Sequence, residues 1–232
     1  MERIVKPEIL DELDGSDPRA VRSRRDLRFI NFLMGNERWI GNLVSSLSED
    51  SWSVSELGAG RGEFTSVLAQ EGRKVLGYDF QPEPAGLPDS VSWSEGDFFR
   101  SLEDDSSEVV VGNLILHHFQ DEQLAELGAL FKNKKRLIFT EPLRSSLSLA
   151  EGYLLWPLIN DVTRHDMIVS IRAGFRPGEL PEKLGLQEGW EWKESTTICG
   201  GLRSIGSPIL TRGESEDAQN HLTIAKPDRS SL

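Results

Sequence analysis

Three glycines and a carboxylate mark the segment of the chain that is most informative about chemistry. Residues 54–64 read VSELGAGRGEF, so Gly58, Gly60 and Gly62 lie between an apolar run and an amphipathic stretch, and Glu56 precedes them. Glycines in this place allow a sharp turn, backbone angles closed to other residues, and a ligand lying against the main chain. The pattern predicts a ligand-binding loop between a strand and a helix.

The spacing separates this loop from two other glycine-rich loops. A phosphate-binding P-loop ends in Gly-Lys-Ser/Thr, whereas this loop ends in Gly62 and Glu63. The dinucleotide fingerprint would have its third glycine at position 63, and a carboxylate there would repel a pyrophosphate. The spacing therefore disfavours a nicotinamide dehydrogenase. Tight binding of a nicotinamide dinucleotide would be the evidence for that alternative.

Two adjacent histidines are candidates for acid–base chemistry, because imidazole titrates near neutral pH. His117 and His118 follow an apolar run that ends at Leu116. If that run is a strand, its side chains alternate between faces, so at most one of the two rings points into a pocket. We take both as candidate bases. The alternative is that they pack a strand-to-helix turn.

A third candidate base, His165, lies in a polar stretch, residues 160–172, that we expect to be a loop. In this stretch Asp161 or Asp166 could orient the imidazole or raise its pKa. The alternative is a solvated loop histidine. The fourth histidine, His221, begins a predicted final strand and is assigned a structural role.

Charged and aromatic side chains provide candidates for binding the acceptor. Arg164 and Arg172 could bind an anionic group, and Phe29 and Trp156 could form pocket walls. Aromatic residues at helical spacing are nevertheless more often core. Five further arginines crowd the first predicted helix, where a solvated face is the simpler reading; they are Arg19, Arg22, Arg24, Arg25 and Arg28.

Alternating short apolar runs and amphipathic segments must position these residues. This alternation is typical of a parallel sheet covered on both faces. One helical stripe ends at Gly72, and another ends at Phe131. The predicted strands are Val54–Leu57, Lys74–Asp79, Val91–Trp93, Glu108–Leu116 and Arg136–Thr140.

The two ends of the chain are predicted separately. Asp17 and Pro18 begin a helix that stops at Gly35, and Asn36 is expected to cap a second helix. We therefore predict a helical N-terminal cap over residues 1–50 and a ligand-binding domain over residues 51–232. Near the C-terminus we expect a short helix over 177–184, strands over 187–199 and 221–226, and a long connection, residues 200–220, between those strands.

From these motifs the chain resembles the class I S-adenosylmethionine-dependent methyltransferases, whose first motif is an acidic residue followed by G-x-G-x-G. The resemblance continues in order with VLGYD ending at Asp79, EGDFF around Asp97, and VVVGNLILHHF at residues 109–119. It covers about residues 52 to 226. It implies an α/β, Rossmann-like fold with a mostly parallel seven-stranded sheet, a final antiparallel strand, and S-adenosyl-L-methionine as cofactor.

The resemblance also implies roles for individual residues. Asp79 would accept hydrogen bonds from the ribose hydroxyls, and Asp97 would bind the adenine amino group while Phe98 packs against the ring. Glu56 would face the methionine portion. The cofactor-binding set is Glu56, Gly58, Ala59, Gly60, Gly62, Asp79, Phe80, Asp97, Phe98 and Asn113.

The residues around the end of the fourth predicted strand limit the class of methyl acceptor. Methyltransferases of nucleic-acid bases typically carry an Asp/Asn-Pro-Pro-aromatic motif there, whereas this chain has NLIL from Asn113. Asn113 has no adjacent acid, so no metal site is predicted. The pattern is similar to small-molecule methyltransferases of the quinone-biosynthesis type. We expect O-methylation of a phenolic or quinol-like compound, with C- or N-methylation left open.

Composition sets the remaining bounds. The 232 residues carry a net charge of −12, which disfavours binding to nucleic acid. No apolar run is long enough to cross a membrane, the N-terminus lacks a signal-peptide core, and Cys199 is the single cysteine. A cytoplasmic protein with a small-molecule partner is therefore expected, and its oligomeric state is left open. A noncatalytic protein that binds S-adenosylmethionine is the alternative function.

Overall fold

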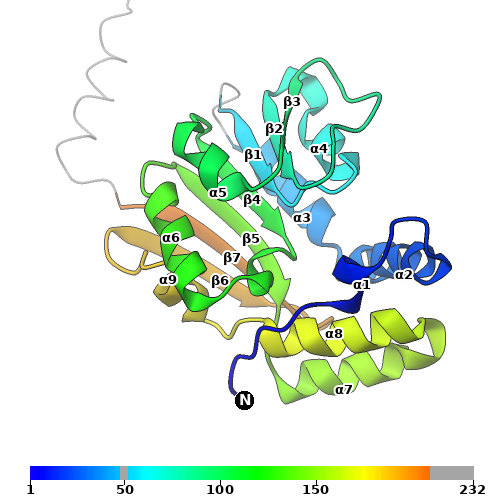
Figure 1. Cartoon of the computed structure of the whole chain (residues 1–232). Helices are drawn as coiled ribbons and strands as arrows, with labels where there is room; N and C mark the ends of the chain where they lie inside the picture. Colours follow the sequence, from blue (N-terminus) through cyan, green and yellow to red (C-terminus); the bar gives the residue numbers. More distant parts are fainter. Residues whose placement is uncertain (48–51, 210–232) are drawn as a thin grey trace, which may run out of the picture.

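Seven strands form one sheet in the order β3-β2-β1-β4-β5-β7-β6 (Figure 1). The computed structural model describes residues 1–47 and 52–209. Within the sheet β7 runs antiparallel to the other six strands, as the resemblance implies. The strands are β1 (Val54–Leu57), β2 (Val75–Asp79), β3 (Val91–Glu95), β4 (Val109–Asn113), β5 (Arg136–Pro142), β6 (Trp190–Thr196) and β7 (Gly201–Pro208).

The central strands are buried on both faces because alternate residues pack into two different cores. Val110 of β4 belongs to one apolar cluster, whereas Val109 and Val111 belong to the other. The first cluster contains side chains from α5 (Phe98–Ser101), α6 (Asp121–Phe131) and α9 (Glu179–Lys183). The second contains side chains from α3 (Asn36–Ser45) and α4 (Glu63–Leu68). This three-layer arrangement brings the C-terminal ends of the parallel strands to one edge.

The N-terminal part contains α1 (Ile9–Glu12), α2 (Pro18–Met34) and α3. Asp17 caps α2 by accepting a hydrogen bond from the backbone N–H of Arg19, and Gly35 ends the helix with a φ of 62°. Gly35, rather than Asn36, is also the N-cap residue of α3, so the expected asparagine cap is wrong. The division into a cap (1–50) and a domain (51–232) stays a prediction.

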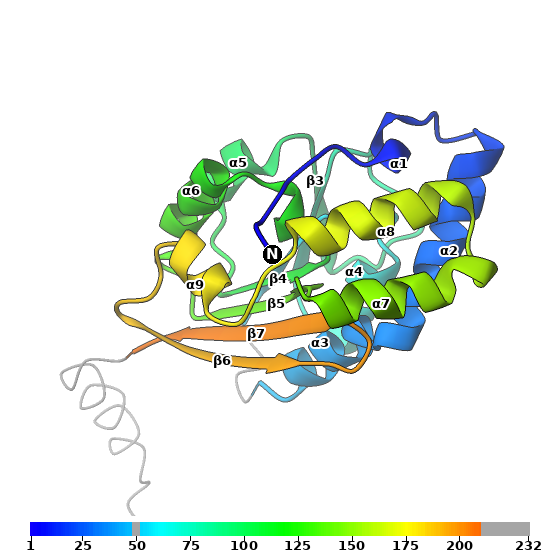
Figure 2. The ribbon, with the colours of Figure 1, turned by 90° about the horizontal axis from the view of Figure 1, so that it is seen from below.

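The polar stretch 160–172 is a helix, not the expected loop. Helix α8 (Asp161–Ala173) is capped by Asn160, whose side chain accepts hydrogen bonds from the N–H groups of Val162 and Thr163. Its buried face includes Val162 and Ile171, whose helical spacing is masked in the sequence by the polar residues between them. Helix α7 (Ser146–Leu155) lies alongside α8 (Figure 2).

The last strands differ from the prediction. Residues 201–208 form β7, which pairs with β5 and β6, so the predicted connection over 200–220 is wrong for these residues. The predicted strand 221–226, with His221, lies outside the described residues. Four short 3-10 turns complete the described chain: η1 (Gln70–Gly72), η2 (Leu102–Asp104), η3 (Leu116–His118) and η4 (Trp156–Leu158).

Candidate active site

The glycine loop joins β1 to α4 and is held against β2. Gly58, Gly60 and Gly62 have φ values of 70°, 60° and 71°, which favour glycine over side-chain-bearing residues. A Cβ on Gly58 would lie 2.9 Å from the Ile115 side chain, whereas a Cβ on Gly60 would meet nothing within 4 Å. The loop is therefore closely packed at Gly58 and open at Gly60, where a ligand can approach the main chain.

Asp79 links the loop to the end of β2. One carboxylate oxygen accepts a hydrogen bond from the N–H of Gly60 at 2.7 Å, and the other accepts from the N–H of Gln81 at 2.9 Å. A carboxylate offers about four acceptor positions. Two of them therefore stay available on a half-buried side chain, which suits a ligand carrying two hydroxyl groups.

Glu56 is buried at the C-terminal end of β1. Its carboxylate accepts a hydrogen bond from the Thr65 hydroxyl at 2.6 Å. Burial raises the pKa of Glu56 to about 7, against the lowering effect of the Thr65 bond. A positive charge placed beside this carboxyl would favour its ionised form.

The adjacent strand ends carry the other residues predicted to bind the cofactor. Asp97 is exposed after β3, where it caps α5. The Phe98 ring is buried between Tyr78 and Phe119 in edge contacts, and Phe80 is 69% exposed. Ala59 and Asn113, the last two residues of the predicted set, are held by hydrogen bonds. The N–H of Ala59 donates to the carbonyl of Tyr78, and the side-chain oxygen of Asn113 accepts from the hydroxyl of Thr140.

After β4 the chain turns sharply at Leu114, which has a φ of 57°. This turn directs three successive N–H groups, those of Ile115, Leu116 and His117, at the carboxylate of Glu141. Glu141 is in β5 and is almost completely buried. The strand therefore ends at Asn113, earlier than predicted, because the following residues bind the neighbouring strand's side chain.

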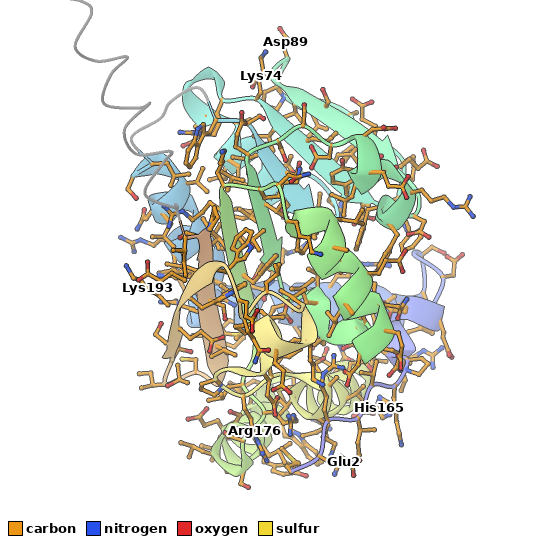
Figure 3. All side chains as sticks on the ribbon, turned by 90° about the vertical axis from the view of Figure 1, so that its left-hand side faces the viewer. Glu2, Lys74, Asp89, His165, Arg176 and Lys193 are labelled. Atoms are coloured by element: carbon orange, nitrogen blue, oxygen red, sulfur yellow. The ribbon has the colours of Figure 1, made fainter. Side chains whose placement is uncertain are left out.

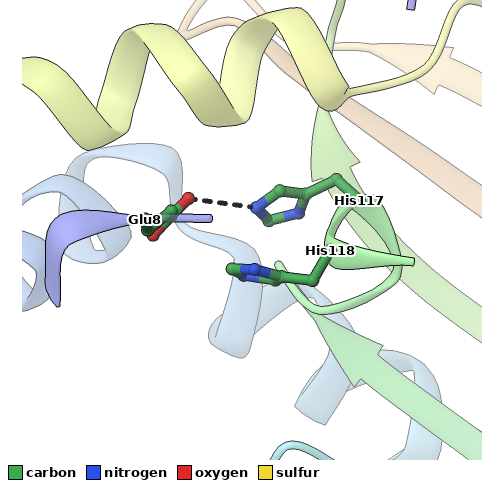
Figure 4. A group of neighbouring side chains, drawn as sticks. All are labelled: Glu8, His117 and His118. Carbon is green, nitrogen blue, oxygen red and sulfur yellow. Dashed lines mark ion pairs between the residues drawn. The ribbon is translucent and has the colours of Figure 1, made fainter. Parts of the chain in front are cut away.

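His117 lies between two carboxylates. Its Nδ1 is 2.7 Å from Glu141, and its Nε2 is 3.7 Å from Glu8 (Figure 4). Burial alone would lower the pKa of His117, but the two carboxylates outweigh it and raise the pKa to about 9. The ring is therefore fixed in orientation and strongly basic.

His118 points to the same side as His117. The two ring centroids are 4.3 Å apart, so the rings do not alternate between two faces as expected, and the expectation that at most one of them points into a pocket stays a prediction. The reason is that both residues belong to the 3-10 turn η3 and not to a strand. Burial and the neighbouring imidazolium lower the pKa of His118 to about 4, which keeps it neutral at pH 7.

Glu8, His117 and His118 also have residue types that bind metal ions. One ligand atom from each lies within 4.8 Å of the others. With no metal ion bound, the two carboxylates favour the protonated form of His117. We treat the cluster below as a proton-binding site, and metal analysis of the protein tests the alternative.

The other predicted acceptor residues meet elsewhere. Trp156, Arg164, His165 and Arg172 line an outer groove together with Ile4, Lys6, Tyr153, Asp161, Ile168 and Val169. Figure 3 shows the side chain of His165 at the end of the molecule opposite Lys74 and Asp89.

Within the outer groove two polar side chains are paired with acids, those of Arg164 and His165. Arg164 forms an ion pair with Asp161 at 2.8 Å, and its guanidinium lies 6.0 Å from the Trp156 ring centroid. His165 Nδ1 lies 3.0 Å from Asp166, one of the two acids expected to orient it. Phe29, on α2, is 42% exposed.

Two residues of this site were missed by the sequence reasoning. Glu141 ends a predicted strand next to the histidines, so its position at a strand end was a usable signal. Glu8 had no such signal, because it precedes every predicted element and reaches His117 only through the tertiary fold.

The fold agrees with the relatives of this chain. A sequence model described as a methyltransferase domain matches residues 27–173. The chain therefore belongs to the methyltransferase-domain family, which confirms the family expected from the motifs. No curated protein matches the chain by sequence.

Solved structures share the fold at low identity. The plantazolicin methyltransferase BpumL in complex with SAH has a TM-score of 0.63 and 11% identity, covering 84% of this chain and 92% of its own. The pyocyanin biosynthetic protein PhzM has a TM-score of 0.58 and 17% identity, with coverages of 88% and 62%. The magnesium protoporphyrin IX methyltransferase ChlM of Synechocystis PCC 6803, with bound SAH, has a TM-score of 0.54 and 16% identity, with coverages of 84% and 100%.

The helices were also compared with the length and hydropathy of a membrane span. In the described part of the chain, no helix is both long enough and apolar enough to span a membrane.

Proposed function

We propose that this protein transfers a methyl group from S-adenosylmethionine to the hydroxyl of a small phenolic or quinol-like acceptor, with His117 accepting the hydroxyl proton. The observation that carries the proposal is the Nδ1 contact of His117 with Glu141 at 2.7 Å. This contact directs Nε2, the other ring nitrogen, away from β5. The acceptor is a small organic molecule and not a nucleic acid.

The glycine loop and its carboxylates fit S-adenosylmethionine. Gly60 leaves open space over the main chain, and Asp79 keeps acceptor positions for ribose hydroxyls. Glu56 is a buried carboxyl that a nearby cation would ionise. When bound, the cofactor supplies a methyl group activated by a sulfonium.

The remaining predicted cofactor contacts belong to the same proposal. Asp97 binds the adenine amino group, and Phe98 and Phe80 provide apolar surface near the base. Gly58, Gly62, Ala59 and Asn113 shape the loop and the floor of the site.

The basicity of His117 suits a phenol. A phenolic hydroxyl has a pKa of about 10, and the pKa of His117 is about 9. Proton transfer between groups with similar pKa values is close to balanced in free energy. Below pH 9 most of the ring is protonated, so the neutral ring that accepts the proton is the minor form at pH 7, and turnover should rise as the pH approaches 9. As the acceptor oxygen gains the methyl group, its O–H bond breaks and the proton goes to Nε2.

The outer groove would bind the end of the acceptor that is distant from the reacting hydroxyl. Trp156, Arg164 and Arg172 would bind a distal, anionic portion of the acceptor, and Phe29 would line its approach. His165, on the same groove, is the competing candidate for the base.

A trideuteromethyl donor tests the proposal. Purified protein is incubated with labelled S-adenosylmethionine and a panel of phenols, hydroquinones and aromatic amines, and the products are analysed by mass spectrometry. We expect one labelled methyl group on an oxygen atom. Labelled products carrying the methyl group only on nitrogen or carbon would contradict O-methylation.

Variants then test the base. His117→Asn keeps a donor for Glu141 but has no basic nitrogen, so turnover should fall by roughly two to four decades while affinity for S-adenosylhomocysteine is kept. If His165→Asn causes that loss and His117→Asn does not, the base lies on α8. Cofactor binding without turnover on any acceptor would support the noncatalytic alternative.

A further inference from the structure

The first residues of the chain form a strap across the histidine site. We define the N-terminal strap as residues 3–10. Arg3 donates hydrogen bonds to the carbonyls of Phe119 and Ala173, at 2.8 Å each, and so joins the turn after β4 to the end of α8. The N–H of Ile4 bonds to Arg172. These contacts fix the first part of the strap.

The second part of the strap is bound by α8. The buried carboxylate of Asp166 accepts hydrogen bonds from the N–H groups of Ile9 and Leu10, at 2.8 and 3.0 Å. Glu8 lies between the two anchored ends, and its carboxylate accepts a hydrogen bond from the Ser170 hydroxyl. The backbone position of Glu8 is therefore set by the hydrogen bonds of the strap residues before and after it.

Burying a carboxylate carries a free-energy cost unless the charge is compensated. The side chain of Glu8 is only 11% exposed, and the charged group in front of it is His117 Nε2 at 3.7 Å. Figure 4 shows Glu8 facing this edge of the ring, whereas Glu141 contacts Nδ1.

We propose that Glu8 is a positioning residue for His117, and that the N-terminal strap completes the catalytic site by supplying this second carboxylate. The role rests on the proposed function of His117. The strap lies before the segment matched by the family model, which begins at residue 27.

The physical effect of Glu8 is to stabilise the imidazolium. When the acceptor's proton arrives at Nε2, the ring becomes positively charged between two negative groups. Charged and titratable groups surround it on every side. Glu141 is on β5, Glu8 on the strap, His118 on η3, Asp11 on α1 and Asp166 on α8, and Arg3 bonds to the His117 carbonyl.

Glu8 on the strap and Asp11 on α1 differ in their own ionisation. The pKa of Glu8 is lowered by its contacts with the two histidines and Ser170, in spite of burial. Burial raises the pKa of Asp11 to about 6, and the charges of Glu8 and Asp166 act in the same direction. Glu8 is therefore the more fully ionised of the two acids around neutral pH.

The first experiment needs no acceptor. The His117 resonance is assigned by its loss in His117→Asn, and its titration is followed by NMR in the otherwise unmodified protein and in Glu8→Gln. We expect the midpoint of His117 to fall by on the order of one pH unit in Glu8→Gln. The matched control is Glu12→Gln, an exposed acid on α1, which should leave the midpoint unchanged. An unchanged midpoint in Glu8→Gln would overturn the proposal whether or not the protein is an O-methyltransferase.

A second variant protects the test against misfolding. Ser170→Ala removes the hydroxyl that holds Glu8 but keeps both charges. We expect a smaller downward shift of the His117 midpoint. If Glu8→Gln does not fold and Ser170→Ala titrates like the unmodified protein, the proposal is wrong.

The kinetic experiment uses an acceptor identified in the labelling assay. In Glu8→Gln the lower apparent pKa of kcat/KM should move to lower pH and the plateau of kcat should fall by tenfold or more, with affinity for S-adenosylhomocysteine unchanged. A loss of cofactor affinity without a change in the pH profile would indicate a merely structural role. Stoichiometric metal in the purified protein, lost in Glu8→Gln and required for turnover, would replace the proposal with a metal site.

Discussion

The imidazole Nδ1 of His117 lies 2.7 Å from the carboxylate of Glu141, on the strand next to the one that His117 follows. Glu141 also accepts hydrogen bonds from the N–H groups of residues 115–117. One buried side chain thus shapes the turn and orients the ring that the turn presents. Local backbone geometry and proposed chemistry depend on the same contact.

The His117 site predicts a pH-dependent contribution to stability. The pKa of His117 is about 9 in the folded protein and close to 6.5 when unfolded. Because the folded value is the higher one, the stabilisation is complete below pH 6.5 and is lost as the pH rises through 9. The free energy of unfolding of the unmodified protein, relative to His117→Asn, should fall across this window by about 3 kcal/mol. Urea unfolding at several pH values measures it, and a constant difference would contradict it.

Asp79 should control cofactor affinity. Asp79→Asn removes a charged acceptor shared by the loop and the proposed ribose hydroxyls, and hydrogen bonds to charged groups contribute about 1.5–3 kcal/mol. We expect the Kd for S-adenosylhomocysteine to rise by about ten- to a hundredfold. Asp89→Asn, at an exposed loop position, is the matched control. Equal affinities of the two variants by calorimetry would exclude Asp79 from the binding site.

Gly60 and Gly72 form a matched pair for testing the loop. Both have positive φ values, 60° and 78°, and a Cβ on either would meet nothing within 4 Å. Replacement by alanine should therefore destabilise both to a similar extent, about 1 kcal/mol. Only Gly60→Ala should also weaken binding of S-adenosylhomocysteine, because only that Cβ enters the proposed cofactor space. Equal effects on binding would place the cofactor elsewhere.

Cofactor binding should release a proton from Glu56. This carboxyl has a pKa of about 7 in the protein without ligand, so it is about half protonated at neutral pH. A cationic ligand favours the ionised form and expels up to about half a proton. Calorimetry in buffers of different protonation enthalpy measures the release, which should vanish in Glu56→Gln. A release that persists in the variant would assign the proton to another group.

The outer groove predicts a separation of kinetic effects. Arg172 is exposed on α8, and it lines the groove whereas His117 does not. Arg172→Ala should raise KM for an anionic acceptor and leave kcat nearly unchanged, because it removes binding without altering the proton acceptor. A large loss of kcat with an unaltered KM would show that the groove takes part in the chemical step.

Much of the fold was predictable because its signals are local. Valines at 109–111 predict a strand buried on both faces, and the glycine spacing after β1 predicts the loop. Helix α8 was missed because polar residues on its outer face obscured Val162 and Ile171. Strand β7 was missed because its glycines and serines resemble a connection, and its pairing with β5 is a tertiary interaction.

The candidate site was predictable only where it follows strand ends. Asp79 and His117 could be placed from the order of the motifs along the chain. The cluster of Glu8, His117 and Glu141 depends on three segments that are distant in sequence, so spacing alone could not reveal it. In the outer groove, residues that are neighbours in sequence also lie together in the fold. Arg164, His165 and Arg172 line the same groove as expected, but they belong to helix α8 and not to a loop.

A crystal structure with S-adenosylhomocysteine and an identified acceptor tests the central claim most directly. We predict that the acceptor oxygen lies within hydrogen-bond distance of His117 Nε2 and faces the sulfur atom of the cofactor product. An acceptor bound with its reactive oxygen in the outer groove beside Trp156 and His165, away from His117, would contradict this account.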